Sequence, residues 1–207
     1  MLQTLEFGSS DVYAPQGSGP VSLQSKRRTV ALKNAKVEAI NHYAGRAARL
    51  ARQGEYPGFF GAQVTLVPVC GSALRREGSL WVPLLLAETM QRLGMAREVT
   101  ALLGRIKAVP KSAAQKAENR PTVQDHYDTM QVDVLAPPPT NIVLIDDVVT
   151  RGATLLAAAS RIAEAYPRAK IRAFAPIRTL SRQEILAFEV PCVGTIVPLG
   201  KSARRDP

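Results

Sequence analysis

The chain has 207 residues, and its 27 Lys and Arg set against 17 Asp and Glu give a formal net charge of +10 at pH 7. An apolar fraction of 46% and a charged fraction of 21% supply enough surface for one buried core, which excludes global disorder, and 15 Pro with 14 Gly exclude a coiled coil. The positive charge favours anionic partners, but it does not distinguish nucleic acids from phosphorylated metabolites.

The predicted elements begin after an N-terminal stretch without a regular pattern. Residues 1–30 mix Gly, Ser, Pro and Gln with no apolar period, so we expect an extended arm. A first helix is predicted over residues 32–53, where apolar side chains recur at steps of three and four. A buried strand over residues 63–70 and a second helix over residues 82–93 follow.

The next part of the chain contains a long polar loop. A short strand is predicted over residues 99–103, and no periodic pattern follows until about Met130, so residues 104–129 are expected to form the loop. Between Arg97 and Arg120, six Lys and Arg against two Glu give a net charge of +4. Long loops in compact domains usually have a function, so we interpret this segment as a basic lid.

The remaining elements alternate between strands and helices. In chain order we expect strands at 130–135 and 141–145, a helix at 152–166, a strand at 171–177, a short helix at 181–188 and a strand at 192–197. This alternation is typical of an α/β fold with an open, mostly parallel twisted sheet and helices on both faces. We expect an N-terminal arm (1–30), a core (31–178) and a C-terminal segment with a basic tail (179–207).

The sequence also has features that bear on compartment and metal content. No apolar stretch has the length of a membrane-spanning helix, and the first residues lack the basic and apolar regions of an export signal. Cys70 and Cys192 have none of the paired spacing of a zinc ribbon or a disulfide framework. We therefore expect a soluble, cytoplasmic protein whose cysteines are small buried apolar residues.

The most informative stretch is NIVLIDDVVTRGATLL, residues 141–156. Its apolar run predicts a buried strand, and Asp146 and Asp147 follow at the carboxyl end, where open α/β sheets bind ligands. The TRGAT turn begins a helix, whose free N–H groups attract a phosphate, and Gly152 allows close approach. Neither GxxxxGK[ST] nor GxGxxG is present. The alternative, a strand and helix joined by an Asp cap, explains one acid and one Thr but not the full spacing.

The same stretch resembles the phosphoribosyl pyrophosphate (PRPP) signature of type I phosphoribosyltransferases, in which apolar residues precede two acids, a short spacer and Thr-Thr-Gly-x-Thr. The resemblance implies that Asp146 and Asp147 bind the ribose hydroxyls and assist Mg²⁺ indirectly, through substrate or water. Arg151 stands where the family usually has its second Thr. The 5′-phosphate would be held by Val148, Val149, Thr150, Arg151, Gly152, Ala153 and Thr154.

The segment VPVCGSALRREGSLWVPLLLAETM, residues 67–90, extends the resemblance upstream. It is similar to ComF-like phosphoribosyltransferases, in which VPVP precedes a basic loop and a helix, so the resemblance covers about residues 63–166. ComF-like proteins normally begin with a cysteine-rich zinc ribbon, and no cysteine precedes Cys70 here. A solvated charge pair is the alternative for the two arginines of the loop. The resemblance implies pyrophosphate binding by Cys70, Gly71, Ser72, Arg75 and Arg76.

The predicted lid lies where type I phosphoribosyltransferases carry a flexible catalytic loop, which closes over PRPP and excludes water. Its candidate catalytic cations are Lys107, Lys111 and Arg120, and the alternative is a solvated basic loop. His126 invites a general-base role, but a lone His near a strand start is more often structural, so we favour the structural role.

The resemblance implies a Mg²⁺-dependent displacement of pyrophosphate from ribose C1 of PRPP by a nitrogen nucleophile, a nucleobase or an amine. A small hood made from the chain ends would select this acceptor, whose identity the sequence leaves open. Arg178 and Phe188 lie where some purine enzymes of the family place a base-contacting cation and a stacking aromatic. A homodimer is the family's usual assembly, and no membrane partner is expected.

Two other classes of function stay open from the sequence. One is a non-catalytic sensor of PRPP or nucleotides with the same fold. The other is a ComF-like accessory protein that binds nucleic acid, which the net charge of +7 in residues 26–52 leaves open, although a solvated helix face explains the same charges. Because the sequence has no basic patch interleaved with aromatic residues, we do not favour nucleic acid as the main partner.

Overall fold

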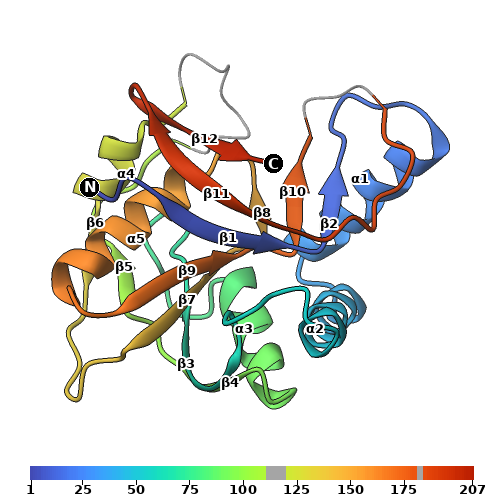
Figure 1. The fold of residues 1–207 in the computed structure, drawn as a ribbon. Coiled ribbons are helices and arrows are strands. Elements are labelled where there is room, and N and C mark those ends of the chain that lie inside the picture. The colour runs from blue at the N-terminus through green and yellow to red at the C-terminus, as the bar shows by residue number, and fades with distance from the viewer. Residues whose placement is uncertain (111–119, 181–183) are drawn as a thin grey trace.

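The computed structural model describes residues 1–110, 120–180 and 184–207. Its centre is a seven-stranded sheet (Figure 1) in which five adjacent strands are parallel and two strands at one edge are antiparallel. The strand order is β12 (Ser202–Asp206), β11 (Cys192–Leu199), β1 (Leu5–Ser9), β9 (Lys170–Phe174), β7 (Asn141–Ile145), β3 (Gly61–Pro68) and β4 (Ala96–Val99). The five parallel strands are β1, β9, β7, β3 and β4.

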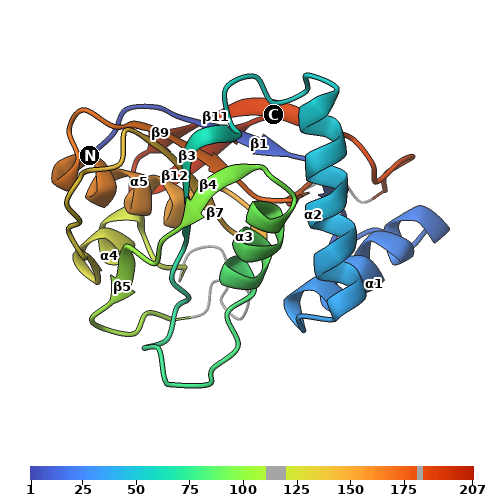
Figure 2. The ribbon, with the colours of Figure 1, turned by 90° about the horizontal axis from the view of Figure 1, so that it is seen from below.

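Strand β7 shows why helices cover both faces of the sheet. Its alternate residues Ile142 and Leu144 belong to one buried cluster, whereas Val143 and Ile145 belong to another, because successive side chains of a strand point to opposite faces. The helical side chains of the first cluster come mainly from α5 (Ala153–Ala165), and those of the second mainly from α2 (Val37–Arg52) and α3 (Val82–Arg92). Figure 2 shows these helices beside the sheet. The predicted α/β fold with an open, largely parallel sheet is confirmed.

A second sheet of three parallel strands continues the first one beyond its carboxyl edge. Strands β1, β9 and β7 each bend and continue into a strand of this second sheet, in the same spatial order. The new strands are β2 (Asp11–Tyr13), β10 (Ile177–Thr179) and β8 (Val148–Val149). The bends are therefore neighbours, and they consist of Ser10, of Ala175 and Pro176, and of Asp146 and Asp147.

The N-terminal part of the chain differs from the predicted extended arm. Strand β1 is an internal strand of the main sheet, and residues Pro20–Lys33 form helix α1. The side chains that α1 buries are mostly hydroxyls, those of Ser22, Ser25 and Thr29, so the helix has no apolar period to recognise. The predicted helix at 32–53 is wrong at its start, because Ala35 takes a positive φ of 49° and separates α1 from α2.

The predicted strand at 99–103 and the predicted loop at 104–129 are also corrected. The predicted strand covers the last residue of β4, the residues that separate β4 from β5 (Leu103–Arg105), and the first residue of β5. Strand β5 does not belong to the main sheet but pairs with β6 (Met130–Val132) in a separate two-stranded sheet. The end of the expected loop is helix α4 (Val123–Asp128). A capping box explains this helix, because Thr122 and Asp125 each accept a hydrogen bond from the other's backbone N–H.

The C-terminal segment differs from the prediction as well. The helix expected at 181–188 is absent from its described part, residues 184–188, and residues 181–183 lie outside the described residues. Glu184 instead accepts hydrogen bonds from the backbone N–H of Ser18 and of Gly19, which are otherwise unpaired at the start of α1. The Glu184 side chain therefore caps the start of α1 although it lies far from that helix in the sequence. No helix in the described ranges has the length and apolar character needed to cross a membrane.

Candidate functional site

The two predicted acids lie at the bend between β7 and β8, at the carboxyl edge of the main sheet. The backbone N–H of Asp146 donates to Phe174 O at 3.0 Å, which fixes the bend to strand β9. Asp146 Oδ1 accepts from the N–H of Asp147 at 2.8 Å, and Asp147 Oδ1 accepts from the N–H of Val148 at 2.8 Å. Each carboxylate is therefore held by the backbone of the next residue, which sets the direction of the two side chains.

The electrostatic state of Asp146 is unusual. Burial, and then the negative charge of Asp147, raise the pKa of Asp146 well above its usual value. Lys33, at the end of α1, acts weakly in the opposite direction. In the described part of the chain no Lys or Arg forms an ion pair with either acid. A cation or hydroxyl donors from a ligand would therefore stabilise the charged form of Asp146.

Gly152 is the N-cap of helix α5, and no side chain of the described residues caps the first N–H groups of this helix. Gly152 has a φ of +89°, and a Cβ added there would lie 2.7 Å from Ile196 of β11. The glycine is thus required by the backbone and by packing against the sheet, and not only by the approach of a ligand. The uncapped N–H groups and the helix dipole favour an anion at this end of α5.

A small cavity joins the acid pair to the start of α5. Its volume is about 40 Å³, compared with the roughly 10–15 Å³ that one water needs, so it has room for a group the size of phosphate. Asp146 lines the cavity, whereas Asp147 does not. All seven residues predicted to hold a phosphate, 148–154, line it. The other lining residues are Arg120, Pro121 and Leu155.

The TRGAT turn is also held from the C-terminal edge strand β12. Arg205 donates from Nε to Thr150 O at 3.0 Å and from Nη2 to Thr179 O at 2.6 Å. Burial, and then the charge of Arg178, lower the pKa of Arg205 to about 10, so it stays a cation at neutral pH. No role for Arg205 can be predicted from the sequence, because nothing in a basic C-terminal tail indicates which of its residues contacts the sheet.

The loop after β3, predicted to bind pyrophosphate, does not line this cavity. Cys70 is buried, and burial raises the pKa of its thiol, so the thiol stays protonated and unreactive at neutral pH. Gly71 and Ser72 use their carbonyls to accept from Arg105 and from Val109. The two arginines of the loop are exposed, and Arg75 lies over the ring of Trp81 at 4.4 Å, while Arg76 has no ion pair in the described ranges.

Two of the three predicted lid cations lie near the cavity. Arg120 lines it, and Arg120 with Lys107 also lines a second, open hollow beside it. Because Arg120 and Pro121 border both hollows, the two are adjacent. Lys111 lies outside the described residues.

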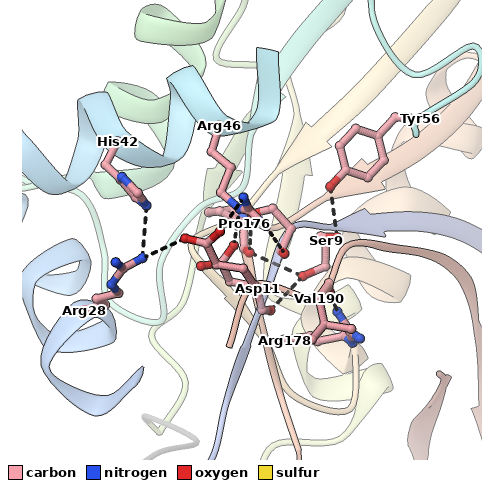
Figure 3. A network of polar contacts seen from close by, with 11 residues as sticks. Ser9, Asp11, Arg28, His42, Arg46, Tyr56, Pro176, Arg178 and Val190 are labelled. Atoms are coloured by element: carbon pink, nitrogen blue, oxygen red, sulfur yellow. Dashed lines mark hydrogen bonds and ion pairs between the residues drawn. The ribbon is translucent and has the colours of Figure 1, made fainter. Parts of the chain in front are cut away.

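The structure does not bring Arg178 and Phe188 into the cavity. Arg178 is 5% exposed and donates from Nη1 to Val190 O at 2.5 Å. Phe188 packs against a small apolar cluster and lies 4.1 Å from the guanidinium of Arg28. Figure 3 shows Arg178 beside a network in which Arg46 contacts Asp11 at 2.7 Å. These residues hold the N- and C-terminal segments together next to the second sheet.

A chain of buried polar side chains that the sequence did not reveal ends at the cavity. Arg105 contacts His126, and His126 Nε2 lies 3.3 Å from Thr154 Oγ1. His126 is 3% exposed, and burial, then Arg105, lower its pKa to about 4. Arg105 is one of the six cations counted in the predicted basic lid, and only its tertiary position buries it.

Comparison with known proteins adds no relative: neither a protein-family model nor a curated protein sequence matches this chain. Within the described ranges, no group of three or more His, Cys, Asp and Glu is arranged to hold a metal ion. The cavity thus brings together the carboxylate of Asp146, the start of α5 and the cations Arg120 and Arg151, and Asp147 lies next to it in the chain.

Proposed function

We propose that this protein binds PRPP and transfers its phosphoribosyl group to a nitrogen nucleophile, releasing pyrophosphate. The observation that carries the proposal is that Asp146 and the uncapped start of α5 border one cavity at the carboxyl edge of the sheet. Phosphate binds at helix N-termini, and a carboxylate beside it can accept hydrogen bonds from ribose hydroxyls. The motif resemblance supports the same ligand.

The residues of the chain would divide the work as follows. The N–H groups of α5 and the hydroxyls of Thr150 and Thr154 hold the 5′-phosphate. Asp146 and Asp147 accept hydrogen bonds from the ribose hydroxyls and orient the sugar. The nitrogen lone pair forms a bond to C1 while the bond from C1 to the pyrophosphate oxygen breaks, and pyrophosphate leaves with that electron pair. The proton lost by the nitrogen goes to solvent.

The cations near the cavity would stabilise the leaving group. Pyrophosphate gains negative charge as the bond to C1 breaks, and Arg120 and Lys107 lie on the side where the second hollow adjoins the first. The acid pair also fits Mg²⁺, which binds one or two carboxylates and otherwise keeps substrate oxygens and water. When bound, Mg²⁺ neutralises part of the diphosphate charge. The raised pKa of Asp146 fits a site completed by a cation or by hydroxyl donors.

The acceptor would bind between the site and the chain-end segments. Residues 184–190 are tied to α1 through Glu184, and to α2 through the contact of Arg46 with Glu189 at 3.0 Å. These segments would form the expected hood. Because Arg178 is buried and Phe188 is packed against Arg28, neither is free for an acceptor without a rearrangement. We therefore no longer propose these two side chains as acceptor contacts.

Calorimetric titration tests the proposal before any acceptor is known. Wild type is titrated with PRPP in the presence of Mg²⁺, then with ribose 5-phosphate, AMP, GMP and UMP. The double variant Asp146→Asn/Asp147→Asn is expected to lose binding, whereas Glu38→Gln, on an exposed part of α2, keeps it. Absence of binding by wild type to any of these ligands overturns the proposal.

Turnover separates an enzyme from a sensor of the same ligand. The nucleotide that binds most tightly identifies the base to supply as acceptor, and pyrophosphate release is then measured. Release that depends on the acceptor supports a transferase. Binding without release, with every nucleobase and with simple amines, would instead support a non-catalytic sensor.

Nucleic-acid binding is a second candidate, because helices α1 and α2 carry many uncompensated positive charges. Arg28 and Arg46 form ion pairs, but five exposed cations of this region form none in the described part of the chain. They are Arg27, Lys33, Lys36, Arg49 and Arg52. Fluorescence anisotropy with labelled single-stranded and duplex DNA would show an affinity that falls steeply with salt. Arg49→Gln/Arg52→Gln should weaken it, whereas Arg97→Gln, which removes a cation paired with Glu98, should not.

A further inference from the structure

Three polar side chains connect the loop after β3 with the start of α5. Arg105, 7% exposed, donates from Nε to Gly71 O at 3.0 Å and from Nη1 to Thr129 Oγ1 at 2.6 Å. Its Nη2 lies 3.4 Å from His126 Nδ1, and His126 Nε2 lies 3.3 Å from Thr154 Oγ1. We name Arg105, His126 and Thr154 the relay. It ends in the cavity, because Thr154 lines the cavity wall.

Donor and acceptor chemistry fixes the direction of each hydrogen bond in the relay. Arginine offers only donors, so His126 Nδ1 must accept from Arg105. A neutral imidazole carries one N–H, which must then be on Nε2, and this group donates to Thr154 Oγ1. His126 is neutral at pH 7 because burial and Arg105 lower its pKa to about 4, although Asp125 of the same helix opposes them.

We propose that the relay orients the Thr154 hydroxyl as a hydrogen-bond donor toward a phosphate in the cavity. Since Oγ1 already accepts from His126, its own O–H remains to donate to the ligand. A fixed donor is complementary to oxygens that only accept, such as those of a phosphate monoester dianion. Arg105 and His126 are positioning residues, because neither lines the cavity. The inference rests on the proposed function and explains, through the oriented hydroxyl of Thr154, why the site would prefer a phosphate.

The relay also links two parts of the proposed site. The same guanidinium that sets the proton on His126 holds the carbonyl of Gly71, in the loop expected to bind pyrophosphate. No acidic side chain pairs with Arg105 within the described residues, so its charge is balanced only by carbonyl, hydroxyl and imidazole partners. A movement of the loop at Gly71 would thus displace Arg105 and, through His126, change the orientation of the Thr154 hydroxyl.

His42, the other histidine of the chain, provides an internal comparison. Its Nε2 lies 3.2 Å from Nη1 of Arg28, which can only donate. The proton of neutral His42 is therefore on Nδ1. The two histidines of this protein should be opposite tautomers.

The first test reads the tautomers directly in the wild-type protein, without a ligand. A long-range ¹H–¹⁵N correlation spectrum at pH 7 distinguishes the two ring nitrogens, and His42→Asn assigns the signals. We expect His126 to be protonated at Nε2 and His42 at Nδ1. An Nδ1–H on His126, or a charged ring at this pH, overturns the relay whatever the protein binds.

The second test measures whether His126 acts through Thr154. Ribose 5-phosphate is titrated into Thr154→Val, His126→Asn and the double variant. Asn keeps an acceptor near the position of Nδ1 but has no donor near that of Nε2. Each single variant should lose about tenfold in affinity, the effect of one hydrogen bond to a charged group. The double variant should bind no more weakly than Thr154→Val alone, since the two act as one unit.

Matched variants complete the second test. Thr154→Ser keeps the hydroxyl and should bind within about threefold of wild type, and His126→Gln, which retains a donor near Nε2, should bind more tightly than His126→Asn. Losses that add in the double variant, or His126→Asn binding like wild type, overturn the relay. If His126→Asn does not fold, Thr154→Val and Thr154→Ser still test the role of the hydroxyl, and the spectrum still tests the tautomer of His126. If wild type binds neither ribose 5-phosphate nor PRPP, the proposed function fails, and the spectrum still tests the relay.

Discussion

Two aspartates at the same edge of the sheet have opposite surroundings, although burial raises the pKa of both. Asp11, at the start of β2, is 2% exposed and contacts Nε of Arg46 at 2.7 Å. Asp146 has no ion pair in the described part of the chain and borders the phosphate-sized cavity. Among the described residues, the fold thus pairs the buried acid that joins its segments with a cation and leaves the acid beside the cavity without one.

The partners of Asp11 show how it joins the segments. Arg46 of α2 reaches from Asp11 to Glu189 at 3.0 Å, so one guanidinium bridges β2 and the C-terminal segment. Arg28 of α1 adds a contact of 3.5 Å to the same glutamate. Asp146, in contrast, interacts with its own backbone neighbour. Variants at these positions should therefore divide into those that change stability and those that change binding.

The largest expected effect is on stability, from Arg46→Met. Removing Arg46 leaves Asp11 buried without a cation, and breaking a buried pair in this way costs about 3–5 kcal/mol of unfolding free energy. Urea denaturation measures the loss at pH 7. Arg49→Met, an exposed position on the same helix, should change stability by less than about 0.5 kcal/mol. Equal effects of the two variants would mean that the buried pair does not hold the segments.

A smaller loss is expected from Gly152→Ala, and it affects both stability and binding. Alanine at a φ of +89° is strained, and its Cβ would lie 2.7 Å from Ile196, so about 2–4 kcal/mol should be lost. The start of α5 would shift, and PRPP affinity should fall with it. Gly45→Ala, in α2 with open space around the glycine, should instead raise stability by about 0.5–1 kcal/mol. A tolerated Gly152→Ala would contradict the geometry of the turn.

Asp146→Asn should change the pH dependence of stability. A raised pKa means that the folded state binds more protons than the unfolded state, so wild-type stability falls as pH rises above about 4, the unfolded pKa of Asp, toward the folded pKa. Asparagine does not titrate, so the variant should gain stability relative to wild type across the same window. Urea denaturation at pH 5 and at pH 8 measures the gain. If the unfolding free energy falls equally with pH in both proteins, the ionised form of Asp146 does not destabilise the folded state.

The smallest effect concerns the cap that ties the C-terminal segment to α1. Hydrogen bonds from Ser18 N–H, then Ser22 Oγ, then Gly19 N–H, lower the pKa of Glu184 to about 2. The stability from this carboxylate is fully present above its unfolded pKa of about 4.3 and is lost as pH falls toward about 2. Glu184→Gln should thus be less stable than wild type at pH 7, and the difference should vanish near pH 2. A difference that is independent of pH would rule out the charged cap.

The parts of the fold that the sequence predicts well are those with strong local patterns. Strand β7 and helix α5 follow from an apolar run and a regular apolar period, and the acids between them mark the site. Helix α1 was not predicted because the side chains that it buries are mostly hydroxyls, those of Ser22, Ser25 and Thr29, which give no apolar period. Strand β12 was not predicted because its sequence, SARRD, is charged, as is common at a sheet edge, and has no apolar alternation.

The same division applies to the site. Residues 148–154 could be predicted as one group because they are consecutive in the sequence, and all of them line the cavity. Arg105 and Arg205 could not, because each reaches the site from a distant strand and looks like an ordinary surface charge in the sequence. Arg178 and Phe188 were assigned by analogy with a family, and their actual contacts depend on segments that the analogy does not cover.

The central claim, that Asp146 is left uncompensated for a sugar phosphate, is tested most directly by one pair of titrations. Wild type and Asp146→Asn are titrated calorimetrically with PRPP and Mg²⁺ at pH 7, after urea denaturation has shown that both are folded. We predict binding by wild type and at least a tenfold loss in a variant that is no less stable. A variant that binds PRPP as wild type does, or that loses stability as Arg46→Met does, would contradict the claim.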